Sequence, residues 1–128
     1  MRREGIINAD LLGATGRLGH TDLLVVCDAG LPIPTGPAVV DLAFRFGIPS
    51  FGEVLSGLLD ELVVEEAIAA EEVEENPATR ELLRSRFPDL GLVSHEELKS
   101  MIAGAKLVVR TGEATPYSNV ILRCGVPF

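Results

Sequence analysis

The stretch that decides the fold covers residues 18–34 and reads LGHTDLLVVCDAGLPIP. Its apolar centre, Leu23–Cys27, has the length and β-branched content of a strand that is buried on both faces. His20 precedes this strand, and Asp28 stands where the strand leaves the core. Because ligands of open α/β sheets bind at the carboxyl ends of strands, Asp28 is either a ligand-facing carboxylate or a turn residue.

The rest of the chain alternates between helix and strand signals. Asparagine or serine caps predict helices over residues 9–17, 50–59, 77–87 and 94–102. Apolar runs predict strands over residues 39–42, 106–110 and 119–124, and residues 62–70 predict a strand that leads into a helical stretch. This alternation predicts one α/β domain over residues 1–128, with a largely parallel sheet flanked by helices in a three-layer, Rossmann-like arrangement. The pattern leaves the strand order open.

Charge and composition exclude several classes of function. The 128 residues carry a net charge of −8, which argues against nucleic-acid binding and favours a neutral ligand over a highly anionic one. No Walker or G-x-G-x-x-G motif follows a strand, so nucleotide binding by those routes is not expected. No apolar run approaches the ~20 residues that span a bilayer, and the amino-terminal segment lacks the apolar core of a signal peptide. We therefore expect a cytoplasmic protein that does not bind membranes.

Four cysteine and histidine side chains are the first candidates for chemistry. Cys27 and Cys124 lie in apolar strand-like runs, which favours buried thiols over disulfides or metal ligands. His20 follows a predicted helix, where it either interacts with the helix end or exchanges protons near neutral pH. His95 follows the cap Ser94, so it is either an exposed helix-start residue or a hydrogen-bonding partner for a polar ligand.

A second polar group lies just before the last predicted strand. Tyr117, Ser118 and Asn119 place a phenol, a hydroxyl and an amide in a row. Each group can donate and accept hydrogen bonds, as recognition of sugar hydroxyls requires. The other interpretation is a polar connection between two strands, and spacing alone does not decide between them.

These residues belong to longer motifs that together resemble the D-ribose pyranase family of sugar mutarotases, over essentially the whole chain. The motifs are GIIN at 5–8, LGHTD at 18–22, VVCDAGLPIP at 25–34, GIPSF at 47–51, RTGE at 110–113 and PYSNVIL at 116–122. Fucose mutarotases are similar in fold and in the histidine–aspartate layout, but their loop after the aspartate differs. Residues 53–92 match least.

The resemblance implies a cofactor-free and metal-free isomerase that interconverts β-D-ribopyranose and β-D-ribofuranose. It implies His20 as the catalytic proton donor. It implies substrate contacts from Asp28, His95, Tyr117, Ser118 and Asn119, although the usual triplet is Tyr-Ala-Asn and Ser118 departs from it. It also implies self-association into a homopentamer or a homodecamer. A mutarotase for fucose or another monosaccharide, and a non-catalytic sugar-binding module, remain alternatives.

The spacing of His20 and Asp28 adds a geometric expectation. The two residues lie eight positions apart, so an extended chain could separate them by ~26 Å. A single ribose molecule cannot bridge that distance. We therefore expect a site built between subunits, in which His20 of one chain meets the substrate-binding residues of another.

Overall fold

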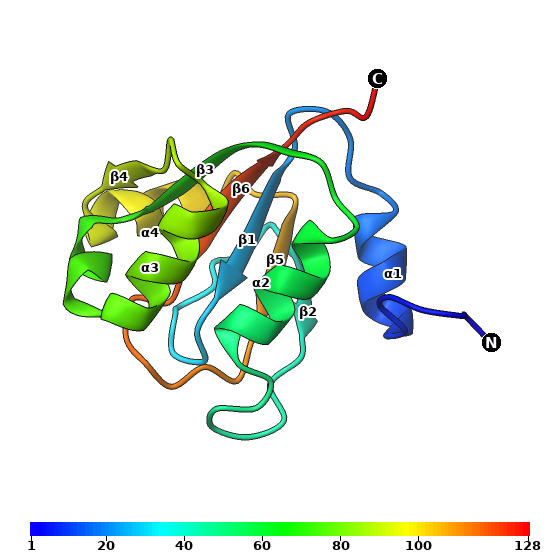
Figure 1. Cartoon of the computed structure of the whole chain (residues 1–128), viewed down its shortest axis with the longest axis horizontal. Helices are drawn as coiled ribbons and strands as arrows, with labels where there is room; N and C mark the ends of the chain where they lie inside the picture. Colours follow the sequence, from blue (N-terminus) through cyan, green and yellow to red (C-terminus); the bar gives the residue numbers. More distant parts are fainter.

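The apolar run after His20 forms strand β1, Leu23–Cys27, in the interior of a six-stranded sheet (Figure 1). The computed structural model describes residues 1–128, and the strand order is β2-β5-β1-β6-β3-β4. β1 pairs in parallel with β5, Leu107–Arg110, and antiparallel with β6, Val120–Cys124. Residues 24–27 are fully buried, as expected for a strand that is covered on both faces.

The remaining strands extend the sheet on both sides of this centre. β2, Ala38–Asp41, pairs in parallel with β5. β3, Val64–Ala70, pairs antiparallel with β6 and in parallel with β4, Gly91–Val93. Only β6 therefore runs against the other strands, and the predicted largely parallel sheet is confirmed.

Helices cover both faces of the sheet, which confirms the three-layer arrangement. One face packs against α1, Ala9–Thr15, α2, Phe51–Leu59, and α3, Pro77–Arg86, through a core that includes Leu11, Leu55 and Leu83. The other face packs against α4, His95–Ile102, through Leu98 and Ile102. Neighbouring residues of β1 enter these two cores alternately, in agreement with the two-residue period of a strand.

The helix starts lie where the capping residues predict them. The side chains of Asn8, Ser50, Asn76 and Ser94 each accept a hydrogen bond from a backbone N–H in the first turn of α1, α2, α3 and α4, respectively. Only Ser50 forms the reciprocal capping box. The segment after β3 continues as a 3₁₀ helix, η1, Glu71–Glu75, so the predicted change from strand to helix is also confirmed.

Besides shifts of one residue at several element ends, one helix end and one short strand differ from the sequence-based expectation. α1 ends at Thr15 rather than at residue 17, because Gly16, a poor helix former, is its C-cap. β4 was not predicted, because three residues are too few to show a strand period.

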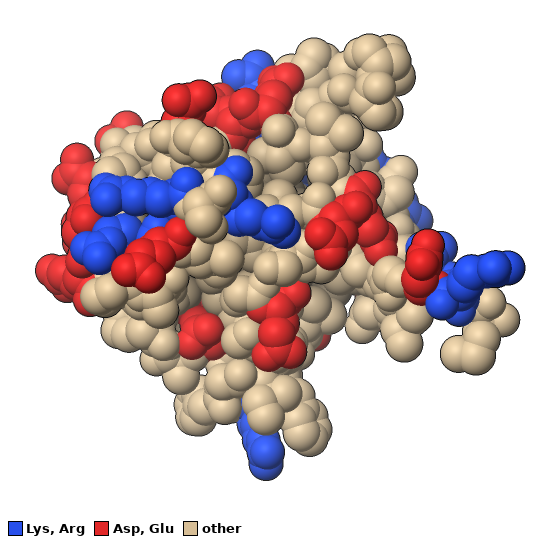
Figure 2. Space-filling model, viewed as in Figure 1, with Lys and Arg blue, Asp and Glu red and all other residues tan.

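Different segments of the chain form the two ends of the sheet. The carboxyl ends of β1 and β5, the loop before β6 and the start of α4 belong to one end, while the start of β1 and the end of β6 lie at the other (Figure 1). No helix combines the length and apolar character that crossing a membrane requires. On the face drawn in Figure 2, arginine side chains near α3 lie beside acidic ones, and Arg80 and Arg84 both pair with Glu74.

Candidate functional site

A cavity of about 410 Å³ opens beside the carboxyl end of β1. This volume is within the range of small-molecule sites. Three of the predicted site residues, Asp28, His95 and Tyr117, line it from three separate segments of the chain. The other lining residues are Ala29, Gly30, Leu31, Pro32, Phe46, Glu113, Ala114, Thr115 and Pro116.

Asp28 is a buried carboxylate, 9% exposed, that is held from two sides. One carboxylate oxygen accepts from the Gly30 N–H at 2.9 Å, and the other accepts from Asn119 Nδ2 at 3.1 Å. The Asn119 side-chain oxygen in turn accepts from the Asp28 N–H at 2.9 Å. A carboxylate offers about four acceptor positions, so Asp28 can still accept hydrogen bonds from ligand hydroxyls.

His95 and Tyr117 form a second pair on the cavity wall. Their rings meet edge to face, with centroids 5.3 Å apart and an interplanar angle of 83°. His95 Nδ1 is buried and has no hydrogen-bond partner. The backbone N–H of His95 donates to the Glu72 carboxylate at 2.9 Å. An unpartnered buried ring nitrogen on a cavity wall is suited to bind a polar ligand atom.

Ser118 and Asn119 lie behind the cavity and do not line it. Both side chains are fully buried. The Ser118 hydroxyl contacts Asn76 Nδ2 at 3.1 Å and Thr79 Oγ1 at 2.9 Å, which links the loop to the start of α3. The Asn119 amide reaches the cavity only through Asp28.

His20 lies at the opposite end of the sheet, in front of the start of β1. Its Nε2 is 3.1 Å from Glu65 Oε2 of β3, and its side chain is 52% exposed. The next residue, Thr21, has φ +71°, an uncommon value for a β-branched residue, and its N–H donates to Cys124 O. β1 lies between His20 and the cavity, and its five residues span roughly 16 Å. His20 therefore does not join the cavity within one chain.

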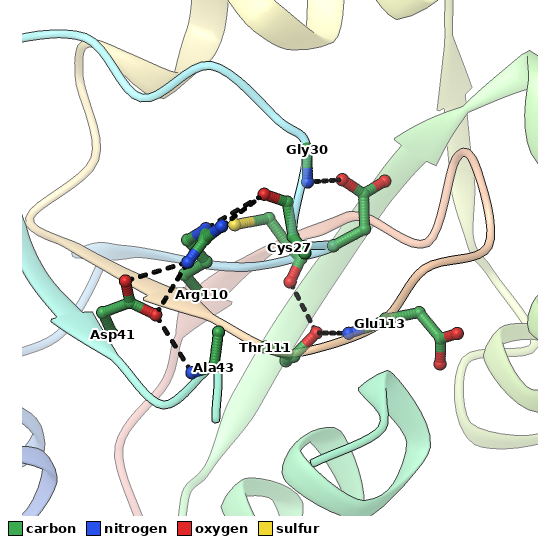
Figure 3. A network of polar contacts seen from close by, with 9 residues as sticks. Cys27, Gly30, Asp41, Ala43, Arg110, Thr111 and Glu113 are labelled. Atoms are coloured by element: carbon green, nitrogen blue, oxygen red, sulfur yellow. Dashed lines mark hydrogen bonds and ion pairs between the residues drawn. The ribbon is translucent and has the colours of Figure 1, made fainter. Parts of the chain in front are cut away.

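A polar network fixes the loop that follows Asp28 (Figure 3). Arg110, at the end of β5, donates to Ala29 O from Nε at 3.0 Å and from Nη2 at 2.7 Å, and it pairs with Asp41 at 2.9 Å. Thr111 Oγ1 donates to Cys27 O at 2.8 Å and accepts from the Glu113 N–H. The motif at residues 110–113 thus anchors the carboxyl end of β1, a role that its sequence alone did not reveal.

Glu113 lines the cavity, although sequence reasoning did not select it as a site residue. Partial burial acts to raise the pKa of its carboxyl group. Hydrogen bonds from the Thr115 side chain and from the backbone of Phe51, Thr115 and Ala114 act in the opposite direction and leave this pKa lowered. In the sequence, Glu113 stands just after a predicted strand end and closes the RTGE motif at residues 110–113.

The thiol of Cys27 agrees with its predicted structural role. The side chain is fully buried, and burial together with the nearby Asp28 charge raises the pKa of the thiol to about 12. A thiol with such a pKa is protonated at neutral pH and is a poor nucleophile.

Comparisons with known proteins agree on one family. The model of the RbsD / FucU transport protein family matches residues 1–127. A protein of Rubrobacter xylanophilus named D-ribose pyranase 1 is 73% identical, with full coverage of both chains. The structure described as Bacillus subtilis RbsD complexed with D-ribose is 42% identical, covers both chains fully and superposes with a TM-score of 0.94.

A fucose mutarotase of Streptococcus pneumoniae, solved in complex with L-fucose, shares the fold with a TM-score of 0.77. It is 20% identical, and the match covers 95% of each chain. Because the family model matches nearly the whole chain, this chain belongs to the RbsD / FucU transport protein family.

Proposed function

We propose that this protein is a D-ribose pyranase, an isomerase that interconverts β-D-ribopyranose and β-D-ribofuranose. The observation that carries the proposal is the convergence of Asp28, His95 and Tyr117 on one cavity wall. These groups offer a carboxylate, an unpartnered ring nitrogen and a phenol, and no lysine or arginine lines the cavity. Such a lining suits a neutral, hydroxyl-rich ligand. The name of the Rubrobacter relative and the ribose in the Bacillus structure support the same substrate.

The reaction defines what the side chains must do. A cyclic ribose opens to its aldehyde when the ring oxygen gains a proton and the anomeric hydroxyl loses one. The open chain then closes through a different hydroxyl. No electrons are transferred, so proton exchange and positioning suffice. An acid–base group contributes typically ~10²–10⁴ in rate, and we assign this role to His20.

We also propose that the working site forms between subunits of a homopentamer or homodecamer. His20 is half exposed and lies at the end of β1 opposite to the cavity, so no motion of its side chain brings it to Asp28 of the same chain. A neighbouring subunit can supply it. Phe44 and Phe46 support such an interface, because they are 79% and 85% exposed and Phe46 lies at the cavity.

In this proposal Asp28, His95 and Tyr117 bind the sugar directly. Asn119 acts by holding Asp28, and Ser118 contributes through its backbone, because its hydroxyl is bonded to Asn76 and Thr79. We infer that the protein works in the cytoplasm, because its two free cysteines fit a reducing compartment.

NMR saturation transfer between the pyranose and furanose signals of ribose tests the proposal. We expect exchange that increases with protein concentration. Faster exchange between fucose anomers than between ribose forms would favour a fucose mutarotase. Ribose binding without accelerated exchange would favour a non-catalytic sugar-binding module.

A further inference from the structure

The side chain of His20 lies beside three charged residues to which the proposed reaction gives no role. They are Glu65, Glu66 and Arg123. One oxygen of Glu65 is 3.1 Å from His20 Nε2, and the other is 3.1 Å from Arg123 Nε. Arg123 also reaches Glu66 at 3.6 Å. β3 and β6 are paired strands with Glu66 opposite Arg123, so the sheet itself brings these residues together. The Glu65 carboxylate is thereby fixed between a histidine and an arginine.

We propose that Glu65 is a positioning residue for His20, which it orients with the ring proton on Nε2 and with Nδ1 directed to the sugar. An ionised carboxylate only accepts hydrogen bonds, so His20 Nε2 must be the donor. The neutral ring then carries its lone pair on Nδ1. Nδ1 is therefore the atom that takes the proton of the anomeric hydroxyl and returns it to the ring oxygen, as the bond between C1 and the ring oxygen breaks and the aldehyde forms. The inference rests on the proposed function, because it assigns an atom to the proton transfer by His20.

The surroundings of His20 explain why such a partner is needed. The backbone is held by the bond from the Thr21 N–H to Cys124 O, but the imidazole is 52% exposed. An exposed ring without a partner can rotate and present either nitrogen. A carboxylate that accepts from one ring nitrogen fixes both the tautomer and the ring orientation.

The same geometry predicts that Glu65 matters more for the reaction than for folding. In the single chain the Glu65 and His20 side chains are 38% and 52% exposed, and an exposed polar contact of this kind contributes little to its stability. Loss of the orienting carboxylate costs roughly 10- to 100-fold in affinity or activity at metal-bound histidines, and we expect a loss of similar size for His20. A change in kcat with little change in melting temperature is therefore the signature of a positioning role.

The test compares Glu65→Ala with Glu66→Ala. Glu66 is the matched control, because it is on the same strand and contacts Arg123 but not His20. Nitrogen-15 chemical shifts of the His20 ring at high pH report which nitrogen carries the proton, and ribose exchange by NMR gives kcat and KM. We expect Glu65→Ala to mix the two tautomers and to lower kcat about tenfold or more with little change in KM. Glu66→Ala should change neither the tautomer of His20 nor kcat.

A third variant, Glu65→Gln, separates charge from hydrogen bonding. Its amide oxygen can still accept from Nε2, so it should recover part of the lost kcat. An unchanged tautomer in Glu65→Ala, or a changed tautomer with unchanged kcat, would overturn the inference. Absence of ribose exchange in the unaltered protein would instead overturn the proposed function, and the nitrogen-15 shifts would still report whether Glu65 sets the ring.

Discussion

At the scale of single residues, the site depends on the Asp28 carboxyl group, which hydrogen bonds hold in a nearly buried position. Asp28 accepts hydrogen bonds from the Gly30 N–H, two residues after it, and from the side-chain amide of Asn119, which stands just before β6. Burying an acceptor in this way is favourable only while its partners stay in place. Asn119 therefore controls both the stability and the ligand affinity of this end of the sheet.

Replacement of Asn119 by alanine tests this dependence. The variant leaves the Asp28 N–H and one carboxylate oxygen without their partners, which costs roughly 1–3 kcal/mol. We expect a lower melting temperature and weaker ribose binding, measured by calorimetry and NMR titration. Thr79→Val is the control, because it removes a buried hydroxyl that does not contact Asp28. Ribose affinity equal to wild type in Asn119→Ala would contradict this role.

His20 allows a sharper separation of binding from chemistry. We expect His20→Ala to retain measurable ribose binding and to lose ~10²–10⁴ of the exchange rate, because an acid–base group is removed while the cavity is untouched. Binding is followed by NMR titration, and exchange by saturation transfer. A variant with an unchanged exchange rate would remove His20 from the reaction.

At the scale of elements, the cavity is shaped by the loop at residues 111–119 and its contacts with α2. Glu113 Oε1 accepts from the Phe51 N–H at the start of α2, and Glu113 O accepts from the Ala29 N–H. One residue thus connects the first turn of α2 with the loop after Asp28. The helix start and the cavity wall are therefore coupled through a charged group.

This coupling predicts a dependence of stability on pH. The pKa of Glu113 is lower in the folded protein than its ordinary value of 4.5, because its hydrogen bonds outweigh the effect of partial burial. Its stabilisation is therefore fully present above pH 4.5 and is lost as the pH falls through the folded pKa. Glu113→Gln should be less stable than wild type at pH 7, and the difference should shrink toward acid pH in thermal melts. The same narrowing in the exposed Glu81→Gln variant would contradict the assignment.

The backbone at Gly112 packs tightly against the loop at residues 45–48. A Cβ at this position would overlap the carbonyl oxygens of Ile48 and Arg45, both of which are backbone atoms. We expect Gly112→Ala to displace the loop that carries Phe46, to lower the melting temperature and to weaken ribose binding. Gly57→Ala, within α2, is the control, because no atom lies near the Cβ position there. We expect this variant to be more stable than wild type by up to about 1 kcal/mol. A Gly112→Ala variant with wild-type melting and binding would contradict this packing.

The elements themselves could largely be predicted from local chemistry. Capping side chains such as Ser50 and Asn76 mark helix starts through bonds to the following backbone, so a short window of sequence contains the signal. β4 was missed because its strand character comes from pairing with β3. The cavity role of Glu113 was missed for a similar reason, since its partners at Phe51 and Ala29 are distant in sequence.

At the scale of the whole molecule, the sheet brings the cavity residues together at one end and keeps His20 at the other. The sequence placed His20 and Asp28 at opposite ends of β1, and the structure agrees. The meeting of Asp28 with His95 and Tyr117 could not be derived from spacing, because it depends on the strand order and on where α4 starts. The contact of His20 with Glu65 likewise requires β1 and β3 to flank β6.

In the proposed assembly two subunits complete one site, and mixing of subunits tests this arrangement. His20→Ala and Asp28→Asn should each be nearly inactive alone, and joint refolding should produce mixed rings. We expect these rings to regain about one quarter of the wild-type ribose exchange, since each site then has even odds of receiving an intact residue from each of its two subunits. Native mass spectrometry confirms that the subunits have mixed. Mixed rings no more active than the separate variants would contradict this arrangement.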